Sequence, residues 1–327
     1  MGDEQQSIQT KKRLTIFLIL TFVFTYLYEF GILFPQWRQV RSIAALNVAP
    51  VMFIPAICAL AARIITKEGF KDSFFNPKFR KGKRRYYLAA WFLPDILTIL
   101  GVLLYFLIYK DNFSIDMEYY VGVLKRQGAE YAPEVARNMV LSSSLAGFFL
   151  APVLNILTCF GEEWGFRAYL FPKLKGMLGL KRSLLLSGLI WGIWHMPLII
   201  MGHNYGLSYS GYPVAGIFAM CAFCLVIGIL FSYLFVRTGS VFAPVFAHGA
   251  LNGFASFGIY FTKDGGNPFI GPSVTGIISG MPFIVCAVIA FYALSKYEGE
   301  APEIAEDKLS DKGYEKNYEI RETQEKH

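Results

Sequence analysis

The sequence PVAGIFAMCAFCLVIGILFSYLFV, residues Pro213–Val236, contains no charged side chain and is followed by Arg237. The hydrocarbon core of a bilayer is about 30 Å thick, and about 20 consecutive apolar residues in an α-helix cross it. This stretch therefore predicts a transmembrane helix. The whole chain has a matching composition, since 54% of its 327 residues are hydrophobic and only 17% are charged. These proportions indicate a polytopic membrane protein and argue against a soluble domain.

Other apolar runs follow the same pattern, so we expect an all-α integral membrane protein with about eight transmembrane helices. In chain order, the expected spans are residues 14–34, 43–65, 86–109, 139–160, 183–201, 213–236, 241–261 and 269–294. We expect one transmembrane domain over residues 1–297. Residues 298–327 are rich in charged side chains and poor in aliphatic ones, which predicts a disordered cytoplasmic tail.

The net charge of +7 is interpreted from where the basic residues lie. Residues 67–85, between the second and third expected spans, contain eight lysines and arginines against two acidic residues. Because cytoplasmic loops of membrane proteins are enriched in basic residues, we predict that this loop and both termini are cytoplasmic. The expected partner of these charges is the lipid bilayer, and no nucleic acid is expected.

Two adjacent carboxylates and an arginine end the fourth expected span, in the sequence Glu162-Glu163-Trp-Gly-Phe-Arg167. Ionised groups within a membrane cost about 2.5–3.5 kcal/mol each on insertion scales, so they are functional candidates by default. On a helix, Glu163 and Arg167 lie one turn apart and can pair. Glu162 is rotated by about 100° from Glu163 and can face another surface. Glu162 is therefore the candidate general base, with a purely interfacial charge cluster as the alternative.

Polar side chains also occur within two later spans. His195 follows Trp191 by one helical turn, and Pro197 removes a backbone hydrogen bond beside it. His248 and Asn252 are four residues apart, so they face the same way and can hold a water or donate to an oxyanion. Each site alone is also explained by helix packing or by a buried histidine bonded to a carbonyl. Together they predict a shared cavity that can activate water against a carbonyl.

Two further acidic residues lie within expected spans. Glu29 is near the end of the first span, and Asp95 follows Pro94 in the third. Neither has an obvious partner in the sequence, so we interpret both as interfacial or structural. The five cysteines, including the pair Cys221 and Cys224, all lie in apolar runs and are interpreted as small buried hydrophobic residues.

At its polar motifs the sequence resembles the CPBP family of intramembrane proteases, which includes the CAAX prenyl proteases and the bacteriocin-processing, or Abi, proteins. The family signature is E-E-x-x-x-R, then an aromatic residue followed by x-x-x-H, then H-x-x-x-N or a close variant, on successive helices. Here the motifs are Glu162-Glu163-x-x-x-Arg167, Trp191-x-x-x-His195 and His248-x-x-x-Asn252. The resemblance covers roughly residues 140–260.

The resemblance implies an intramembrane endopeptidase that hydrolyses a membrane-associated peptide or protein, with a prenylated CAAX C-terminus as one such substrate. It implies that Glu162 activates the hydrolytic water and that His195 positions the water or the substrate. It also implies that His248 and Asn252 stabilise the oxyanion. Glu163, Arg167 and Trp191 would support the site.

The resemblance leaves the cofactor open, because the family is often described as metalloproteases and a metal-free, glutamate-dependent mechanism has also been argued. Glu162, His195 and His248 are the candidate zinc ligands, with one position left for water. The chain has no H-E-x-x-H motif, and we lean against a tightly bound zinc. Two other functions stay open: a non-catalytic membrane immunity or scaffold protein, and a transporter. The transporter is disfavoured because the polar residues are confined to the second half of the chain.

Overall fold

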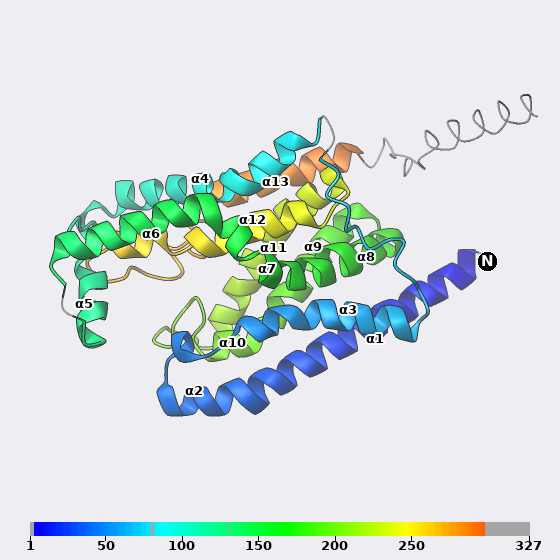
Figure 1. Cartoon of the computed structure of the whole chain (residues 1–327), viewed down its shortest axis with the longest axis horizontal. Helices are drawn as coiled ribbons and strands as arrows, with labels where there is room; N and C mark the ends of the chain where they lie inside the picture. The colour runs from blue at the N-terminus through cyan, green and yellow to red at the C-terminus, as the bar shows by residue number, and fades with distance from the viewer. Residues whose placement is uncertain (1–2, 80–81, 130, 298–327) are drawn as a thin grey trace, which may run out of the picture.

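The computed structural model describes residues 3–79, 82–129 and 131–297. Every named element within these ranges is a helix, and no strand occurs among them (Figure 1). The predicted all-α class is confirmed. The predicted tail, residues 298–327, lies outside the described residues, and the division of the chain at residue 297 stays a prediction.

The helices are joined by short turns and a few longer loops. The first part of the chain contains α1 (Asp3–Tyr28), the π-helix η1 (Glu29–Leu33), α2 (Phe34–Val40), η2 (Ile43–Ala45), η3 (Ala49–Phe53), α3 (Ile54–Ile65), α4 (Arg84–Ile108), η4 (Lys110–Asn112), α5 (Glu118–Arg126) and α6 (Pro133–Leu154). The second part contains α7 (Ile156–Glu163), the π-helix η5 (Trp164–Leu170), α8 (Phe171–Leu178), α9 (Leu180–Trp194), α10 (Met196–Ile200), α11 (Val214–Thr238), α12 (Phe242–Phe254), η6 (Phe257–Phe261) and α13 (Met281–Tyr297).

Several helices are long and apolar enough to cross a membrane, judged by length and composition. Four stretches in the described residues meet this condition: Glu4–Val40, Arg84–Ile108, Pro133–Leu154 and Val214–Thr238. Two shorter apolar helical stretches, Ala49–Ile65 and Met281–Lys296, accompany them. The chain is thus an integral membrane protein with several apolar helices, as expected. The cytoplasmic placement of its termini stays a prediction.

Some expected spans are interrupted, and the interruptions have local causes. The span expected at 139–160 breaks at Asn155, whose amide donates to the carbonyls of Ala151 and Gly249. The span expected at 183–201 breaks at His195, two residues before Pro197, which has no N–H to continue the helix.

The last expected span was placed too early. It was expected from residue 269, but α13 begins at Met281. Residues 269–280 instead fold back on themselves, since the N–H groups of Ile277 and Ile278 donate to the carbonyls of Phe269 and Ile270. A Cβ at Gly276 would lie 2.4 Å from the backbone nitrogen of Gly271, so this turn leaves no room for a side chain. Hydropathy indicates burial and does not distinguish such turns from a helix.

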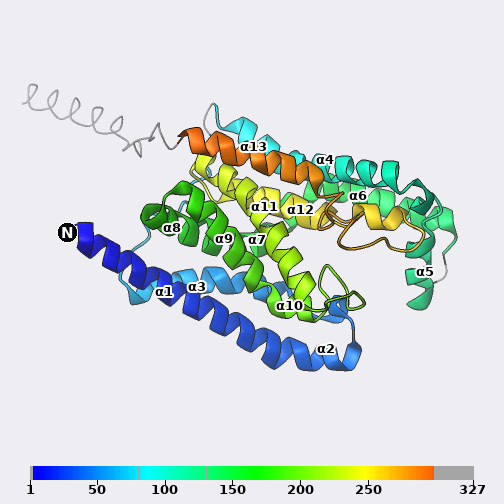
Figure 2. The same ribbon diagram turned by 180° about the vertical axis from the view of Figure 1, so that it is seen from behind.

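The central helices carry the site. α1, α2 and α3 lie along one side of the molecule, α4, α6 and α13 lie along the other, and α7, α9 and α11 run between them (Figures 1 and 2). α9 packs along α11, and α12 packs against both α6 and α4. The contact between α9 and α11 is close enough that a Cβ at Gly192 would lie 2.5 Å from the Cα of Cys221. Small residues of this kind let membrane helices approach each other.

We expect Gly192→Ala to push α9 away from α11 and to destabilise the protein by about 1–3 kcal/mol, the usual cost of overpacking. The measurement is the midpoint of thermal unfolding in detergent. Gly176→Ala in α8 is the matched control, because no atom lies within 4 Å of a Cβ there. The control should melt at or slightly above the wild-type temperature, since alanine favours helix. A Gly192→Ala protein as stable as the control would contradict the close contact.

Candidate active site

The two adjacent glutamates lie where α7 changes into the π-helix η5. Wide π-helical turns are rare and occur frequently at functional sites. Behind the glutamates, this segment packs directly on η3 and α3. A Cβ at Gly161 would lie 2.3 Å from the carbonyl oxygen of Met52, and one at Gly165 would lie 2.5 Å from the Cβ of Pro55. The backbone contact seals one side of the segment, and both Glu162 and Glu163 are buried.

Glu163 has two partners on different elements. Its Oε2 lies 3.3 Å from Nε of Arg167, which is the pair expected from the spacing of the two residues. Its Oε1 lies 2.8 Å from Nδ1 of His248 on α12, a contact that the sequence did not indicate. All three side chains are buried, so Glu163 links α7 and η5 to α12 in the interior.

Glu162 faces a different surface from its neighbour, as expected. Its Oε2 accepts a hydrogen bond of 2.8 Å from Nε1 of Trp191 on α9. The same indole has the guanidinium of Arg167 over its face, with the guanidinium carbon 4.0 Å from the ring centroid. The imidazoles of His195 and His248 both contact the indole in edge-on geometry, each with its ring centroid 5.6 Å away. Trp191 therefore brings the three sequence motifs into one buried cluster.

The two histidines are held in the same way. Nδ1 of His195 lies 2.8 Å from the carbonyl oxygen of Trp191, which can only accept, so this nitrogen carries the proton. Nδ1 of His248 faces the Glu163 carboxylate at 2.8 Å and donates to it. These partners assign the tautomer of each ring and leave both Nε2 atoms free of the anchoring bonds. Each Nε2 can then bind a water or a substrate atom.

Helix α1 holds the break at His195 in place. Pro197 has no N–H to donate to the carbonyl of Ile193, and the hydroxyl of Tyr26 donates to that carbonyl instead, at 2.8 Å. The next residue of α9, Trp194, donates through Nε1 to the hydroxyl oxygen of Thr25, also at 2.8 Å. Two successive residues of α1 thus fix the two residues that precede His195.

Asn252 lies at the edge of the cluster. It follows His248 by one turn of α12, but its side chain is exposed, whereas His248 is buried. Its amide nitrogen lies 3.7 Å from the sulfur of Cys159. The structure therefore brings Glu162, Glu163, Arg167, Trp191, His195 and His248 together and leaves Asn252 facing outward beside them.

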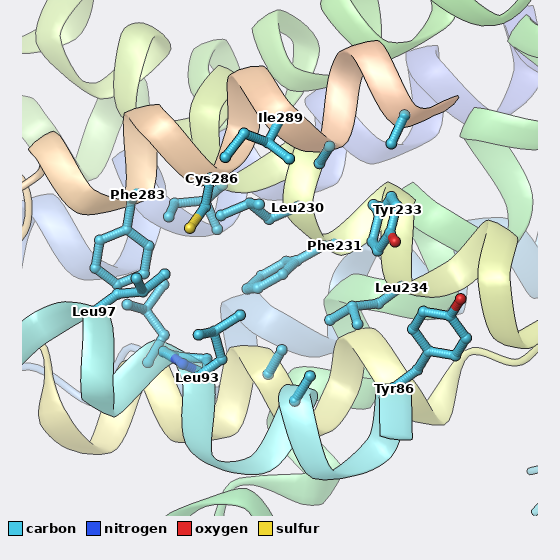
Figure 3. Close-up of a pocket in the computed structure, with 17 residues that line it drawn as sticks. Tyr86, Leu93, Leu97, Leu230, Phe231, Tyr233, Leu234, Phe283, Cys286 and Ile289 are labelled. Carbon is cyan, nitrogen blue, oxygen red and sulfur yellow. The ribbon is translucent and has the colours of Figure 1, made fainter. Parts of the chain in front are cut away.

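Sequence reasoning missed Phe231 of α11. Its ring centroid lies 5.4 Å from that of His248 and 6.0 Å from that of Trp191. Phe231 also lines an apolar cavity of about 220 Å³ between α4, α11, α12 and α13, together with Leu97 and Cys286 (Figure 3). One side chain thus separates the polar cluster from an apolar space. No signal in the sequence marked Phe231, because it lies within an unbroken apolar run.

The acidic residues Glu29 and Asp95 are buried inside the protein. Both are 0% exposed, and the oxygens of both carboxyl groups have no hydrogen-bond partner within the described part of the chain. The interpretation of these two residues as interfacial or structural stays a prediction, because burial within the protein does not give their depth in a membrane. The hydropathy of a helix does not show which of its faces packs inward.

The sequence offers Glu162, His195 and His248 as candidate zinc ligands. Within residues 3–79, 82–129 and 131–297, no group of three or more His, Cys, Asp or Glu side chains is placed to hold a metal ion. Glu162, His195 and His248 each use one polar atom in an internal hydrogen bond and keep another polar atom outside these bonds. The identity of the cofactor, zinc or none, stays a prediction.

Comparison with known proteins gives the cluster a family context. Residues 143–254 match the family described as Type II CAAX prenyl endopeptidase Rce1-like, and the match contains all three motifs. A CAAX prenyl protease 2 of Methanococcus maripaludis is 36% identical over 52 residues, which are 16% of this chain and 19% of the relative. The chain therefore spans about a fifth of the length of the curated relative it matches. The resemblance expected from the motifs is confirmed.

We expect Trp191→Phe to destabilise the protein by about 1–3 kcal/mol, because a buried carboxylate loses its donor. Thermal unfolding in detergent measures the change. Trp37→Phe is the matched control, since Trp37 is also buried but its Nε1 has no hydrogen-bond partner among the described residues. The two substitutions remove the same atoms. If both variants lose the same stability, the hydrogen bond to Glu162 contributes nothing measurable.

Proposed function

We propose that the Rce1-like segment of this chain, residues 143–254, is the catalytic part of an intramembrane endopeptidase. The observation that carries the proposal is the meeting of Glu162, His195 and His248 around one indole. These residues come from α7, from the break between α9 and α10, and from α12. A carboxylate and two oriented imidazoles are the groups that water-mediated peptide hydrolysis requires.

Glu162 is the base in this proposal. The Trp191 indole fixes one of its oxygens and leaves the other for a water molecule. As the water oxygen attacks the peptide carbonyl, Glu162 takes a proton from it. Nε2 of His195, a lone-pair acceptor when Nδ1 carries the proton, holds the second hydrogen of that water. Glu162 and His195 thus each bind one hydrogen of the attacking water.

His248 and Asn252 stabilise the oxyanion. In its imidazolium form, His248 donates from Nδ1 to Glu163, at 2.8 Å, and from Nε2 to the developing negative charge. Asn252 supplies a second donor through its amide, and its exposed position on α12 suits a group that contacts substrate. Arg167 balances the charge of Glu163 from the other side, at 3.3 Å.

The substrate we propose is a membrane-associated peptide or protein with a prenylated CAAX C-terminus. The relative from Methanococcus maripaludis is described as a CAAX prenyl protease. The cavity behind Phe231 is lined almost entirely by apolar side chains, so it suits an isoprenoid chain (Figure 3). Its position next to His248 would place the peptide that carries the chain close to the base.

Cleavage of a prenylated CAAX peptide by purified protein tests the proposal. We expect Glu162→Gln, which keeps shape and removes the base, to lower kcat by about 10²–10⁴-fold, the usual contribution of a general base. Glu118→Gln, on the exposed part of the chain between α4 and α6, is the control and should retain full activity. We also expect a chelator to leave the wild-type rate unchanged. Equal rates for Glu162→Gln and wild type would refute the proposal.

Filling the apolar cavity tests the prenyl assignment separately. Cys286→Phe places a ring in the cavity and should raise KM for the prenylated peptide about tenfold, which corresponds to about 1.4 kcal/mol of lost binding. KM for the same peptide without the lipid should not change. Val285→Phe is the control, because Val285 is exposed and does not line the cavity. If Cys286→Phe leaves KM for both peptides at the wild-type value, the lipid binds to another surface.

A further inference from the structure

The backbone turns at His195, and the turn leaves one carbonyl without its usual donor. His195 has φ −79° and ψ −5°, and its N–H donates to the carbonyl of Gly192, three residues back, at 3.1 Å. An α-helical N–H donates four residues back. The carbonyl of Ile193 would take its bond from residue 197, but Pro197 has no N–H. The direction in which His195 points therefore depends on what else holds this turn.

Tyr26 of α1 supplies the missing donor. Its hydroxyl donates to the carbonyl of Ile193 at 2.8 Å, across 167 positions of the chain. The ring of Tyr26 lines an open apolar groove of about 590 Å³ with Phe22 and Phe30, and the side chain of Ile193 is 45% exposed. The bond thus lies near the surface of a helical stretch that is long and apolar enough to cross a membrane. Hydrocarbon offers no replacement donor there, so an unsatisfied carbonyl is costly.

Thr25, the preceding residue of α1, holds the neighbouring side chain. Its hydroxyl oxygen accepts a hydrogen bond of 2.8 Å from Nε1 of Trp194, and both side chains are buried. The ring of Trp194 contacts the imidazole of His195 edge-on, with the two centroids 4.8 Å apart. Helix α1 therefore fixes the turn before His195 twice, once through the backbone of Ile193 and once through a side chain that touches the imidazole.

Other contacts of the imidazole come from the family-matched segment, residues 143–254. Nδ1 of His195 bonds to the carbonyl of Trp191 at 2.8 Å, and the sulfur of Cys224 lies 3.8 Å from the same nitrogen. Trp191 and Ile193 belong to the same turn of α9. A shift of this turn therefore displaces the anchored ring, and with it Nε2, which binds the attacking water in the proposed mechanism.

We infer that Tyr26 is a positioning residue for His195, supported by Thr25, an inference that rests on the proposed peptidase function. Tyr26 acts through the carbonyl of Ile193 and takes no part in the proton transfers, because its own proton is committed to that bond. The first helix, outside residues 143–254, is thereby part of the catalytic unit. Misplacing a reacting group by about 1 Å can cost on the order of 10²-fold in rate, so a lost anchor has a measurable effect.

Removal of the Tyr26 hydroxyl tests the inference. We expect Tyr26→Phe to lower kcat on the prenylated CAAX peptide about tenfold and to leave KM unchanged, because the groups that bind the substrate keep their places. Tyr87→Phe is the matched control, since the Tyr87 hydroxyl also donates to a backbone carbonyl, that of Pro77. Tyr87→Phe should keep the wild-type kcat. An equal loss in the two variants, or a wild-type kcat in Tyr26→Phe, would overturn the inference and leave the peptidase function intact.

The His195 ring gives a second readout that needs no substrate. The chain has four histidines, so isotope-labelled histidine gives few ring-nitrogen NMR signals in detergent, and His195→Asn identifies the signals of His195. We expect Tyr26→Phe to shift the Nδ1 signal of His195 and Tyr87→Phe to leave it in place. An unshifted signal in Tyr26→Phe overturns the inference, even where kcat falls. A wild-type protein that cleaves no peptide refutes the peptidase function, whereas the His195 signal still tests the positioning.

Pro197→Ala tests whether the hydroxyl acts through the carbonyl of Ile193. Alanine restores the N–H that can donate to this carbonyl, so the hydroxyl of Tyr26 is no longer needed there. In the Pro197→Ala background we expect Tyr26→Phe to lower kcat less than about threefold, because two changes that share one partner are not additive. An undiminished loss in that background would overturn the inference. If Tyr26→Phe does not fold, Thr25→Val removes the acceptor of Trp194 and should shift the same His195 signal; an unshifted signal there would overturn the inference as well.

Discussion

The rest of the site depends on the contacts that the buried carboxylate of Glu163 makes with Arg167 and His248. Its carboxylate is fully buried and is shared between Arg167 at 3.3 Å and His248 at 2.8 Å. Removing one partner of a buried pair costs about 3–5 kcal/mol, because it leaves an uncompensated charge. The two contacts therefore hold α12 against the junction of α7 and η5. They also pair Arg167 with Glu163 and orient the ring of His248. The neighbouring Glu162 then accepts its hydrogen bond from Trp191.

A second constraint comes from Pro197, which acts on the backbone. It ends α9 before His195 and leaves the carbonyl of Ile193 for the hydroxyl of Tyr26. That bond brings α1 against the centre of the molecule. A single proline thus explains both the bend that carries the histidine and the attachment of the first helix, which lies outside residues 143–254.

The sequence predicted the contacts that depend on helical spacing, and packing determined the others. Glu163 and Arg167 pair as expected because four residues make about one turn. The bond from Trp191 to Glu162 joins residues 29 positions apart, and the bond from His248 to Glu163 joins residues 85 apart. Such pairs follow from how helices pack, which hydropathy does not encode. Residues 269–280 were wrongly predicted as helix, because an apolar turn and an apolar helix have the same composition.

Adjacent glutamates acquire different roles because successive residues of a helix point about 100° apart. Glu163 contacts Arg167 through one carboxylate oxygen and His248 through the other, so both oxygens take part in contacts that hold the structure together. Glu162 faces an indole N–H, a weaker and neutral partner, so its charge is held but not neutralised. The base of the proposed peptidase needs this intermediate state. A carboxylate locked in an ion pair accepts a proton poorly, and one without any partner does not stay ionised in a buried site. The guanidinium of Arg167 completes the arrangement, because it lies over the face of the Trp191 ring, 4.0 Å from the ring centroid, while its Nε lies 3.3 Å from Glu163.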